Sequence, residues 1–374
     1  MSTKFTIFAV LAAAVTFSSA GLLMPSVSAQ LTSTKAGPSN SVPVPTPTPE
    51  PAATVSPTPK PSFDDPNEII KVDTELVNLN VRVIDRNSRP INDIQQKDFK
   101  IYEDGVQQTI DFFSKSEVPT TYSIVVDNSG SMRPQLEKVI EAGKILVNTN
   151  KPEDKTSIIR FVGKEKISIE QDLTTNKSDL TDALDDLYIE GGQTAIIDAV
   201  YLATENLEAD AKSKVSDDRG RRAIVLVTDG EDRDSYYNIK QLMDLLRESD
   251  VQIYVVGLVS DLSSEGGLIT KSPQGKAKAF LEQLASETGG KAYFPKGVDE
   301  LPQIGRDIAS ELRTQYSIGY IPSNEAHDGT FRNIKITVDD GPNKQKRIAV
   351  SRNGRTAEGG SPKLQKSSQT PVKP

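Results

Sequence analysis

Two kinds of hydrophobic pattern alternate along the chain. Apolar and polar residues alternate strictly in "VNLNVRV" at residues 77–83 and, near the C-terminus, in "QYSIGYIP", "FRNIKITV" and "KRIAVS", which predicts half-buried strands. "DFKIYEDGVQQTIDFF" adds an Asp104-Gly105 turn between two strand-like runs, a hairpin signal. Because a sheet of two or three strands is marginal alone, we expect residues 67–118 and 315–352 to pair as one small β-sandwich.

The region between these strands, residues 119–314, has a different pattern. Short apolar runs that predict strands, "YSIVV", "TSIIRF", "AIVLV" and "VQIYVVGL", alternate with helical spacing. The helical signals are Leu136, Val139, Ile140 and Gly143; then Ile196, Ala199, Val200, Ala203 and Leu207; then "AFLEQLASETGG". This alternation indicates an α/β fold with a doubly wound, mostly parallel sheet, inserted into the small sandwich.

The two ends of the chain have compositions that do not favour a core. "MSTKFTIFAVLAAAVTFSSAGLLMPSVSAQ" has the layout of a secretory signal peptide over residues 1–29, which predicts export; an uncleaved membrane anchor is the alternative, because the apolar run is almost long enough to span a bilayer. Residues 30–66 are rich in Pro, Thr and Ser and predict a disordered, extended linker. Residues 353–374 predict a disordered tail.

Composition narrows the classes of function. A formal net charge of −8 argues against nucleic acid as the main partner, since phosphate binding needs clustered Lys and Arg. The absence of Cys excludes disulfides, thiolate metal sites and thiol nucleophiles. After signal cleavage we expect no integral membrane segment, because no other stretch approaches transmembrane length.

Polar residues that follow the predicted strands are the candidates for chemistry, because ligands of open α/β sheets bind beyond the carboxyl ends of the strands. "DNSGSM" follows "YSIVV", "EGGQTAIIDAV" opens a helix after a pair of glycines that free the backbone, and "TDGED" follows "AIVLV". The candidate ligands in these three loops are Asp127, Ser129, Ser131, Thr194 and Asp229.

Two carboxylates and three hydroxyls are hard oxygen ligands, which suit Mg²⁺, Mn²⁺ or Ca²⁺. One coordination position would stay open for an Asp or Glu of a partner protein. Taken singly, these residues have commoner roles: Ser and Thr cap helices, and Asp forms turns. Glu231, Asp232 and Asp234 could add a second ion or simply form a solvated loop, and Tyr236 and Tyr237 could line a recognition surface or only cover that loop.

The order D-x-S-x-S after a buried strand, Gly-Gly-x-Thr at a helix start and Thr-Asp-Gly after a second strand resembles the metal-ion-dependent adhesion site of von Willebrand factor type A domains. The resemblance covers residues 119–314. It implies a Rossmann-like fold and a metal bound, directly or through water, by Asp127, Ser129, Ser131, Thr194 and Asp229. Members of this family can switch by moving the last helix, here residues 301–313, and the flanking segments are similar to those of exported bacterial proteins.

Enzymatic alternatives fit less well. A Mg²⁺-dependent phosphohydrolase similar to haloacid dehalogenases would need a carboxylate where Ser129 stands. The single His, His327, is far in sequence from the serines; no G-x-S-x-G elbow occurs, and "GKAK" does not match a nucleotide-binding loop. We therefore predict a non-enzymatic, exported module for metal-dependent protein binding or adhesion, located in the periplasm, at the cell surface or in the medium. A structural envelope module without metal dependence is the main alternative.

Overall fold

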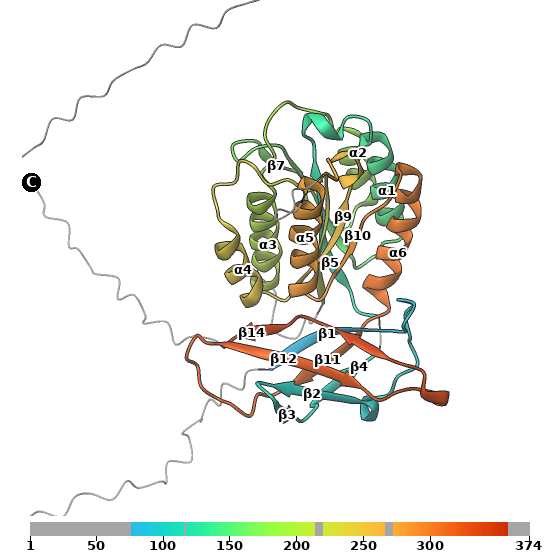
Figure 1. The fold of residues 1–374 in the computed structure, drawn as a ribbon, viewed down its shortest axis with the longest axis vertical. Coiled ribbons are helices and arrows are strands. Elements are labelled where there is room, and N and C mark those ends of the chain that lie inside the picture. The colour runs from blue at the N-terminus through green and yellow to red at the C-terminus, as the bar shows by residue number, and fades with distance from the viewer. Residues whose placement is uncertain (1–75, 116, 214–219, 266–271, 358–374) are drawn as a thin grey trace, which may run out of the picture. The chain divides into compact units, whose positions relative to one another are not determined.

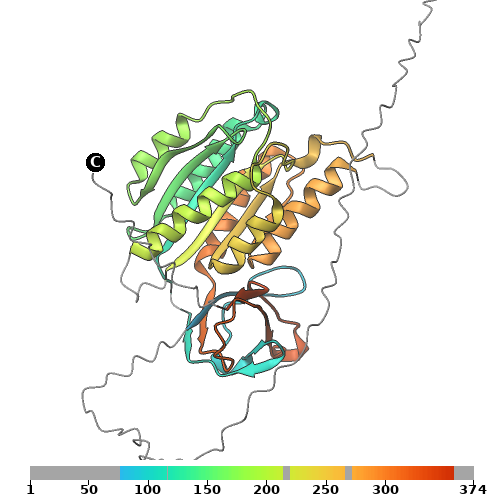
Figure 2. The same ribbon diagram turned by 90° about the vertical axis from the view of Figure 1, so that its left-hand side faces the viewer.

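The structure is a computed structural model that describes residues 76–115, 117–213, 220–265 and 272–357 (Figure 1). The expected signal peptide, linker and most of the expected tail lie outside these residues. The described part contains one six-stranded sheet with helices on both faces and two four-stranded sheets (Figures 1 and 2).

The central sheet is mostly parallel, as predicted. Its strands are β5 (Thr120–Asp127), β6 (Lys155–Phe161), β7 (Ile167–Thr174), β8 (Arg221–Thr228), β9 (Val251–Gly257) and β10 (Lys291–Tyr293). They lie in the order β10-β9-β8-β5-β6-β7, and only the pairing of β7 with β6 is antiparallel. The four expected strands correspond to β5, β6, β8 and β9. The central strand β5 therefore lies between β6 and β8, and the loops after β5 and β8 are neighbours.

Helices cover both faces because side chains of a strand alternate between them. On one face Ile124 and Val126 of β5 pack with α1 (Leu136–Asn148), α2 (Lys177–Asp185) and α6 (Leu301–Arg313). On the other face Val125 packs with α3 (Ile196–Ser213), α4 (Ile239–Glu248) and α5 (Pro273–Glu287). The sequence patterns predicted α1, α3 and α5, and the family resemblance implied α6, but neither revealed the shorter α2 and α4.

Strands from both ends of the described chain form the two smaller sheets. These strands are β1 (Val77–Ile84), β2 (Phe99–Glu103), β3 (Val106–Gln108), β4 (Phe112–Ser114), β11 (Tyr316–Tyr320), β12 (Phe331–Val338), β13 (Ile348–Val350) and β14 (Gly354–Thr356). The sheet orders are β13-β1-β11-β4 and β14-β12-β2-β3. Each sheet pairs an N-terminal strand with a C-terminal one, β1 with β11 and β2 with β12, and both share one apolar core. The expected pairing of the two terminal groups is confirmed.

Strand β14 corrects the expected start of the tail at residue 353. Gly354–Thr356 pair with β12, and the Arg355 side chain donates a hydrogen bond of 3.0 Å to Glu103. A Cβ on Gly354 would lie 2.3 Å from the Arg332 carbonyl oxygen and 2.4 Å from the Phe331 ring, so glycine permits the close pairing. Three residues are too few for a visible alternation, which is why the sequence pattern missed this strand.

The two smaller sheets lie beside the end of the central sheet at which the parallel strands begin (Figures 1 and 2). Buried charged side chains join the two parts. Arg221 at the start of β8 donates to the Gln315 carbonyl oxygen just before β11 and to the Ser317 hydroxyl of β11, and Arg82 of β1 pairs with Glu311 of α6. Within the described ranges, no helix is both long and apolar enough to cross a bilayer.

Candidate metal centre

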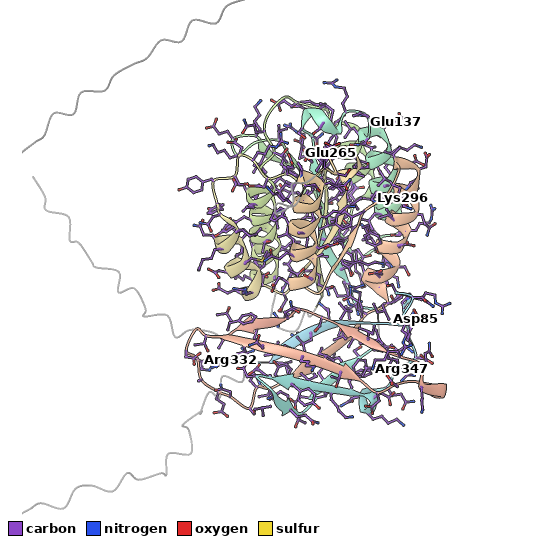
Figure 3. All side chains as sticks on the ribbon, viewed as in Figure 1. Asp85, Glu137, Glu265, Lys296, Arg332 and Arg347 are labelled. Carbon is purple, nitrogen blue, oxygen red and sulfur yellow. The ribbon has the colours of Figure 1, made fainter. Side chains whose placement is uncertain are left out.

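The candidate ligands lie at the end of the central sheet opposite the smaller sheets. Glu137, at the start of α1 and just beyond the first candidate loop, is at this far end, whereas Asp85, just after β1, and Arg347, just before β13, lie beside the smaller sheets (Figure 3). Asp127 is the last residue of β5, and Asp229 directly follows β8. Because β5 and β8 are parallel neighbours, both carboxylates leave the sheet at the same edge.

The structure brings four of the five candidate ligands into one hydrogen-bonded chain. The Ser129 and Ser131 hydroxyl oxygens are 3.1 Å apart, and the Ser131 hydroxyl donates to an oxygen of the Asp229 carboxylate. Asp127 accepts a 2.9 Å hydrogen bond from the Ser129 backbone N–H. A short 3₁₀ turn, Gly130–Met132, follows Ser129 and keeps the two serines close.

Burial disfavours the charged form of Asp127. Its side chain is fully buried, and this burial, together with the nearby charge of Asp229, raises the pKa of Asp127 to about 6. Hydrogen bonds from Ser129 and from the Thr228 hydroxyl, 2.7 Å away, partly offset this effect. Two carboxylates of like charge beside one another, one of them out of water, form a site that a bound cation would stabilise.

Thr194 is buried but is not part of that hydrogen-bonded chain in the described residues. Its backbone carbonyl accepts hydrogen bonds from the Arg233 and Asp234 N–H groups, at 2.8 and 3.1 Å, which ties its loop to the one that follows Asp229. The next residue, Ala195, donates to the Val162 carbonyl at 2.9 Å. Backbone contacts thus place Thr194 between the ends of β6 and β8.

The glycines before Thr194 have a different role from the one expected. Neither Gly191 nor Gly192 adopts a positive φ, so the turn does not require glycine for its backbone conformation. A Cβ on Gly192 would lie 2.5 Å from Val162, whereas a Cβ on Gly191 would meet nothing within 4 Å. Gly192 therefore serves the close approach of two loops.

The acidic run after Asp229 is occupied by structural contacts. Asp232 accepts from the Ile197 N–H at the start of α3 at 3.1 Å, and Asp234 lies 3.5 Å from the Lys164 ammonium group. Glu231 pairs with Arg233. Tyr237 stacks on Tyr201 with ring centroids 4.0 Å apart. These acids hold the loop in place, and Tyr237 covers part of it.

Residues that support the site were missed by the sequence analysis. Thr228 orients Asp127, and its hydroxyl also accepts from the Gly230 N–H at 3.1 Å. Asn128 is also fully buried. Its side-chain amide donates to the Tyr188 carbonyl at 2.8 Å, and its backbone carbonyl accepts from the Glu190 N–H at 2.9 Å. Asn128 stands between two candidate ligands, so its position in the motif was the available signal; its partners are distant in sequence.

The donor set fits a hard divalent cation. It consists of carboxylate and hydroxyl oxygens only, from Asp127, Asp229, Ser129 and Ser131, with Thr194 on the adjacent loop. The hydrogen bonds from Ser129 and Thr228 reach different oxygens of Asp127 and so hold the carboxylate in one orientation.

Comparison with known proteins agrees with this arrangement. The von Willebrand factor type A domain family matches residues 123–307. The "Uncharacterized protein sll0103" of Synechocystis sp. is 34% identical over 115 residues, which are 30% of this chain and 26% of that protein. The chain thus matches about a quarter of the length of that curated relative.

Several solved structures are similar to this chain. An aerotolerance-related membrane protein from Bacteroides fragilis is 23% identical, with a TM-score of 0.40, over 52% of this chain and 98% of its own. A von Willebrand factor type A protein from Catenulispora acidiphila is 10% identical, with a TM-score of 0.42, over 76% and 75% of the two chains. Proximal thread matrix protein 1 from the mussel byssus, described with a zinc-occupied MIDAS motif, is 20% identical, with a TM-score of 0.40, over 55% and 48%.

The family match begins inside β5 and ends inside α6, so it spans the central sheet and the loops that carry all five candidate ligands. Residues 123–307 are a von Willebrand factor type A domain, and the chain belongs to the VWA domain proteins.

Proposed function

We propose that the VWA domain binds one divalent cation through Asp127, Ser129, Ser131, Thr194 and Asp229, and that an Asp or Glu of a partner protein completes the coordination. The observation that carries this proposal is the convergence of the two serines and two carboxylates at one edge of the sheet, with Asp127 buried. The all-oxygen donor set favours Mg²⁺, Mn²⁺ or Ca²⁺.

The function that follows is metal-dependent protein binding or adhesion. Three of the five proposed ligands are neutral hydroxyls, and the two carboxylates just balance the charge of a divalent ion. Such an ion takes six or more oxygen ligands, so a carboxylate oxygen of a partner can fill a remaining position. We assign no catalytic role, because the site lacks a second acid or base in the position that phosphoryl transfer would need. The acidic net charge supports a protein rather than a nucleic-acid partner.

Calorimetric titration of Mg²⁺, Mn²⁺ and Ca²⁺ into the full chain tests the metal site. We expect saturable binding of one ion, lost in Asp127→Asn and Asp229→Ala. Asp210→Asn, which removes an acid on α3 that pairs with Lys155, is the matched control. Unchanged titration of the two site variants would contradict the assignment, and absence of binding to the wild type would favour a structural envelope module.

We also propose that the chain is exported, on the basis of its N-terminal pattern. Expression of the full gene with its N-terminus intact should yield a mature chain that begins at Gln30 and lies outside the cytoplasm. Recovery of an uncleaved chain in the membrane fraction would instead support an anchor.

A further inference from the structure

Tyr188 is a large exposed side chain whose backbone is attached to the metal-site loop. Its side chain is 54% exposed, and its carbonyl accepts the 2.8 Å hydrogen bond from Asn128. Asn128 is fully buried and lies between the candidate ligands Asp127 and Ser129. Tyr188 is therefore an exposed tyrosine whose backbone is fixed to the loop that carries two of the candidate ligands.

The ring of Tyr188 also packs on a charged side chain that is itself fixed. The Arg160 guanidinium lies 4.5 Å from the ring centroid, and Arg160 is itself fixed by Glu170 at 2.9 Å and Glu190 at 3.0 Å. Lys166 pairs with Glu190 at 2.7 Å. The two positive and two negative charges in this group balance, so it offers an uncharged aromatic surface rather than a charged one. A ring held in this way loses little conformational entropy on binding, which is the property of tyrosines that dominate interfaces.

A second exposed tyrosine lies on the loop bonded to Thr194. Tyr236 is 80% exposed, and its N–H donates to Asp198 at 2.7 Å. Its ring is nearly perpendicular to that of Tyr237, with a centroid distance of 5.3 Å. Both loops that adjoin the candidate ligands therefore carry one exposed aromatic ring with a fixed backbone.

We propose that Tyr188 is a specificity-determining contact, which selects a partner segment whose metal-binding Glu or Asp lies next to proline. This inference rests on the proposed function, because the carboxylate supplies the attachment to the metal. The uncharged Tyr188 surface on Arg160 complements an uncharged, flat neighbour. Proline is such a neighbour, packs on aromatic rings, and keeps the segment extended before binding, which lowers the entropy lost.

Surface-immobilised peptides provide the test, with the full chain in solution and Mg²⁺ present. The peptides are Gly-Pro-Glu-Pro-Gly, Gly-Gly-Glu-Gly-Gly and Gly-Pro-Gln-Pro-Gly, and equilibrium binding is measured for each. We expect the Pro-Glu-Pro peptide to bind roughly three- to tenfold more tightly than the glycine peptide, the range of a single aromatic contact. The Gln peptide should not bind.

The variants separate this inference from the proposed function. Tyr188→Ala should reduce the preference for proline to about one, and Tyr188→Phe, which keeps the ring, should preserve it. Equal binding of the two Glu peptides to the wild type, or an unchanged preference in Tyr188→Ala, would overturn the role of Tyr188 while leaving the metal site intact. No Mg²⁺-dependent binding of either Glu peptide would overturn the carboxylate contact, and the role of Tyr188 with it.

Discussion

Burial couples the charge of Asp127 to the stability of the metal-free protein. The pKa of this carboxyl is raised from 3.8 to about 6, first by burial and then by the charge of Asp229. Between these two values the folded state holds a proton that the unfolded state releases, so the stability contributed by protonation is present below pH 4 and is lost as the pH rises through 6. This difference in the pKa of Asp127 between the folded and unfolded states corresponds to about 3 kcal/mol in the free energy of unfolding.

Asp127→Asn should therefore stabilise the metal-free protein at neutral pH while it abolishes metal binding. An amide can still accept from the Ser129 N–H and donate to the Thr228 hydroxyl, so the local contacts survive. Urea unfolding in the presence of EDTA should show a gain of up to about 3 kcal/mol at pH 8 that disappears near pH 4. A gain of the same size at both pH values would show that the charge of Asp127 is not its cause.

Thr194 is the one proposed ligand outside the series of hydrogen bonds that links Asp127, Ser129, Ser131 and Asp229, so its role as a ligand needs a separate test. Thr194→Val keeps the shape of the buried side chain but removes its hydroxyl, and we expect Mg²⁺ affinity to fall about tenfold, or about 1.4 kcal/mol. Calorimetry with the exposed neighbour variant Gln193→Ala provides the control. Equal affinities in Thr194→Val and the wild type would remove Thr194 from the ligand set.

At the scale of elements, the site depends on how closely the loop before α3 approaches the loops after β6 and β8. Thr194 is bonded through its carbonyl to the loop after β8, and Ala195 is bonded to Val162 at the end of β6. Gly192 lies against the same Val162. Packing between loops, rather than backbone freedom, explains why glycine stands at this position.

The adjacent glycines form a matched pair for measurement. Gly192→Ala should weaken metal binding and lower stability by about 1–3 kcal/mol, because its Cβ would overlap Val162, whereas Gly191→Ala should change little. Adding Val162→Ala to Gly192→Ala should recover part of the loss. Equal effects of the two single substitutions, measured by thermal unfolding and Mg²⁺ titration, would contradict the packing explanation.

The contacts of strand β14 lead to a second prediction at this scale. A chain that ends at Asn353 would lose Arg355 and leave the buried Glu103 carboxylate without its arginine, at a cost of about 3–5 kcal/mol. A chain that ends at Ala357 should unfold like the full chain. Urea denaturation of the two truncated chains distinguishes them, and equal stabilities would show that β14 contributes nothing to the fold.

For the whole molecule, α6 joins the VWA domain to the smaller sheets. The Glu311 carboxylate of α6 accepts from Arg82 of β1 at 2.7 Å, and from Lys291 at 2.6 Å and Tyr293 at 3.0 Å in β10. Arg82 also donates to the Gly290 carbonyl at 2.7 Å. One buried carboxylate thus connects a sandwich strand with a helix and an edge strand of the central sheet.

Glu311→Ala should destabilise the protein by about 3–5 kcal/mol, because Arg82 would remain buried without its counter-charge. The exposed substitution Glu282→Ala on α5 should stay within about 0.5 kcal/mol of the wild type. We expect calorimetric unfolding of the wild type in one transition and of Glu311→Ala in two. A single unshifted transition in the variant would refute the coupling.

The sequence by itself determined the type of most elements and the identity of the proposed ligands. Periodicity and strand ends are local properties, so β5, β6, β8 and β9, the helices α1, α3 and α5, and the D-x-S-x-S loop could be recognised from a few residues each, whereas α6 was expected from the family resemblance. The pairing of terminal strands also followed, because neither group could bury a face alone.

Only the tertiary structure decided which of these residues meet. The order of the strands, the bond from Thr228 to Asp127, the contact of Gly192 with Val162 and the seat of Tyr188 on Arg160 all join segments far apart in the sequence. Short strands such as β14 carry too little local pattern to be seen. Burial, which raises the pKa of Asp127, is likewise a property of the packed molecule, because it requires neighbours that the local sequence does not specify.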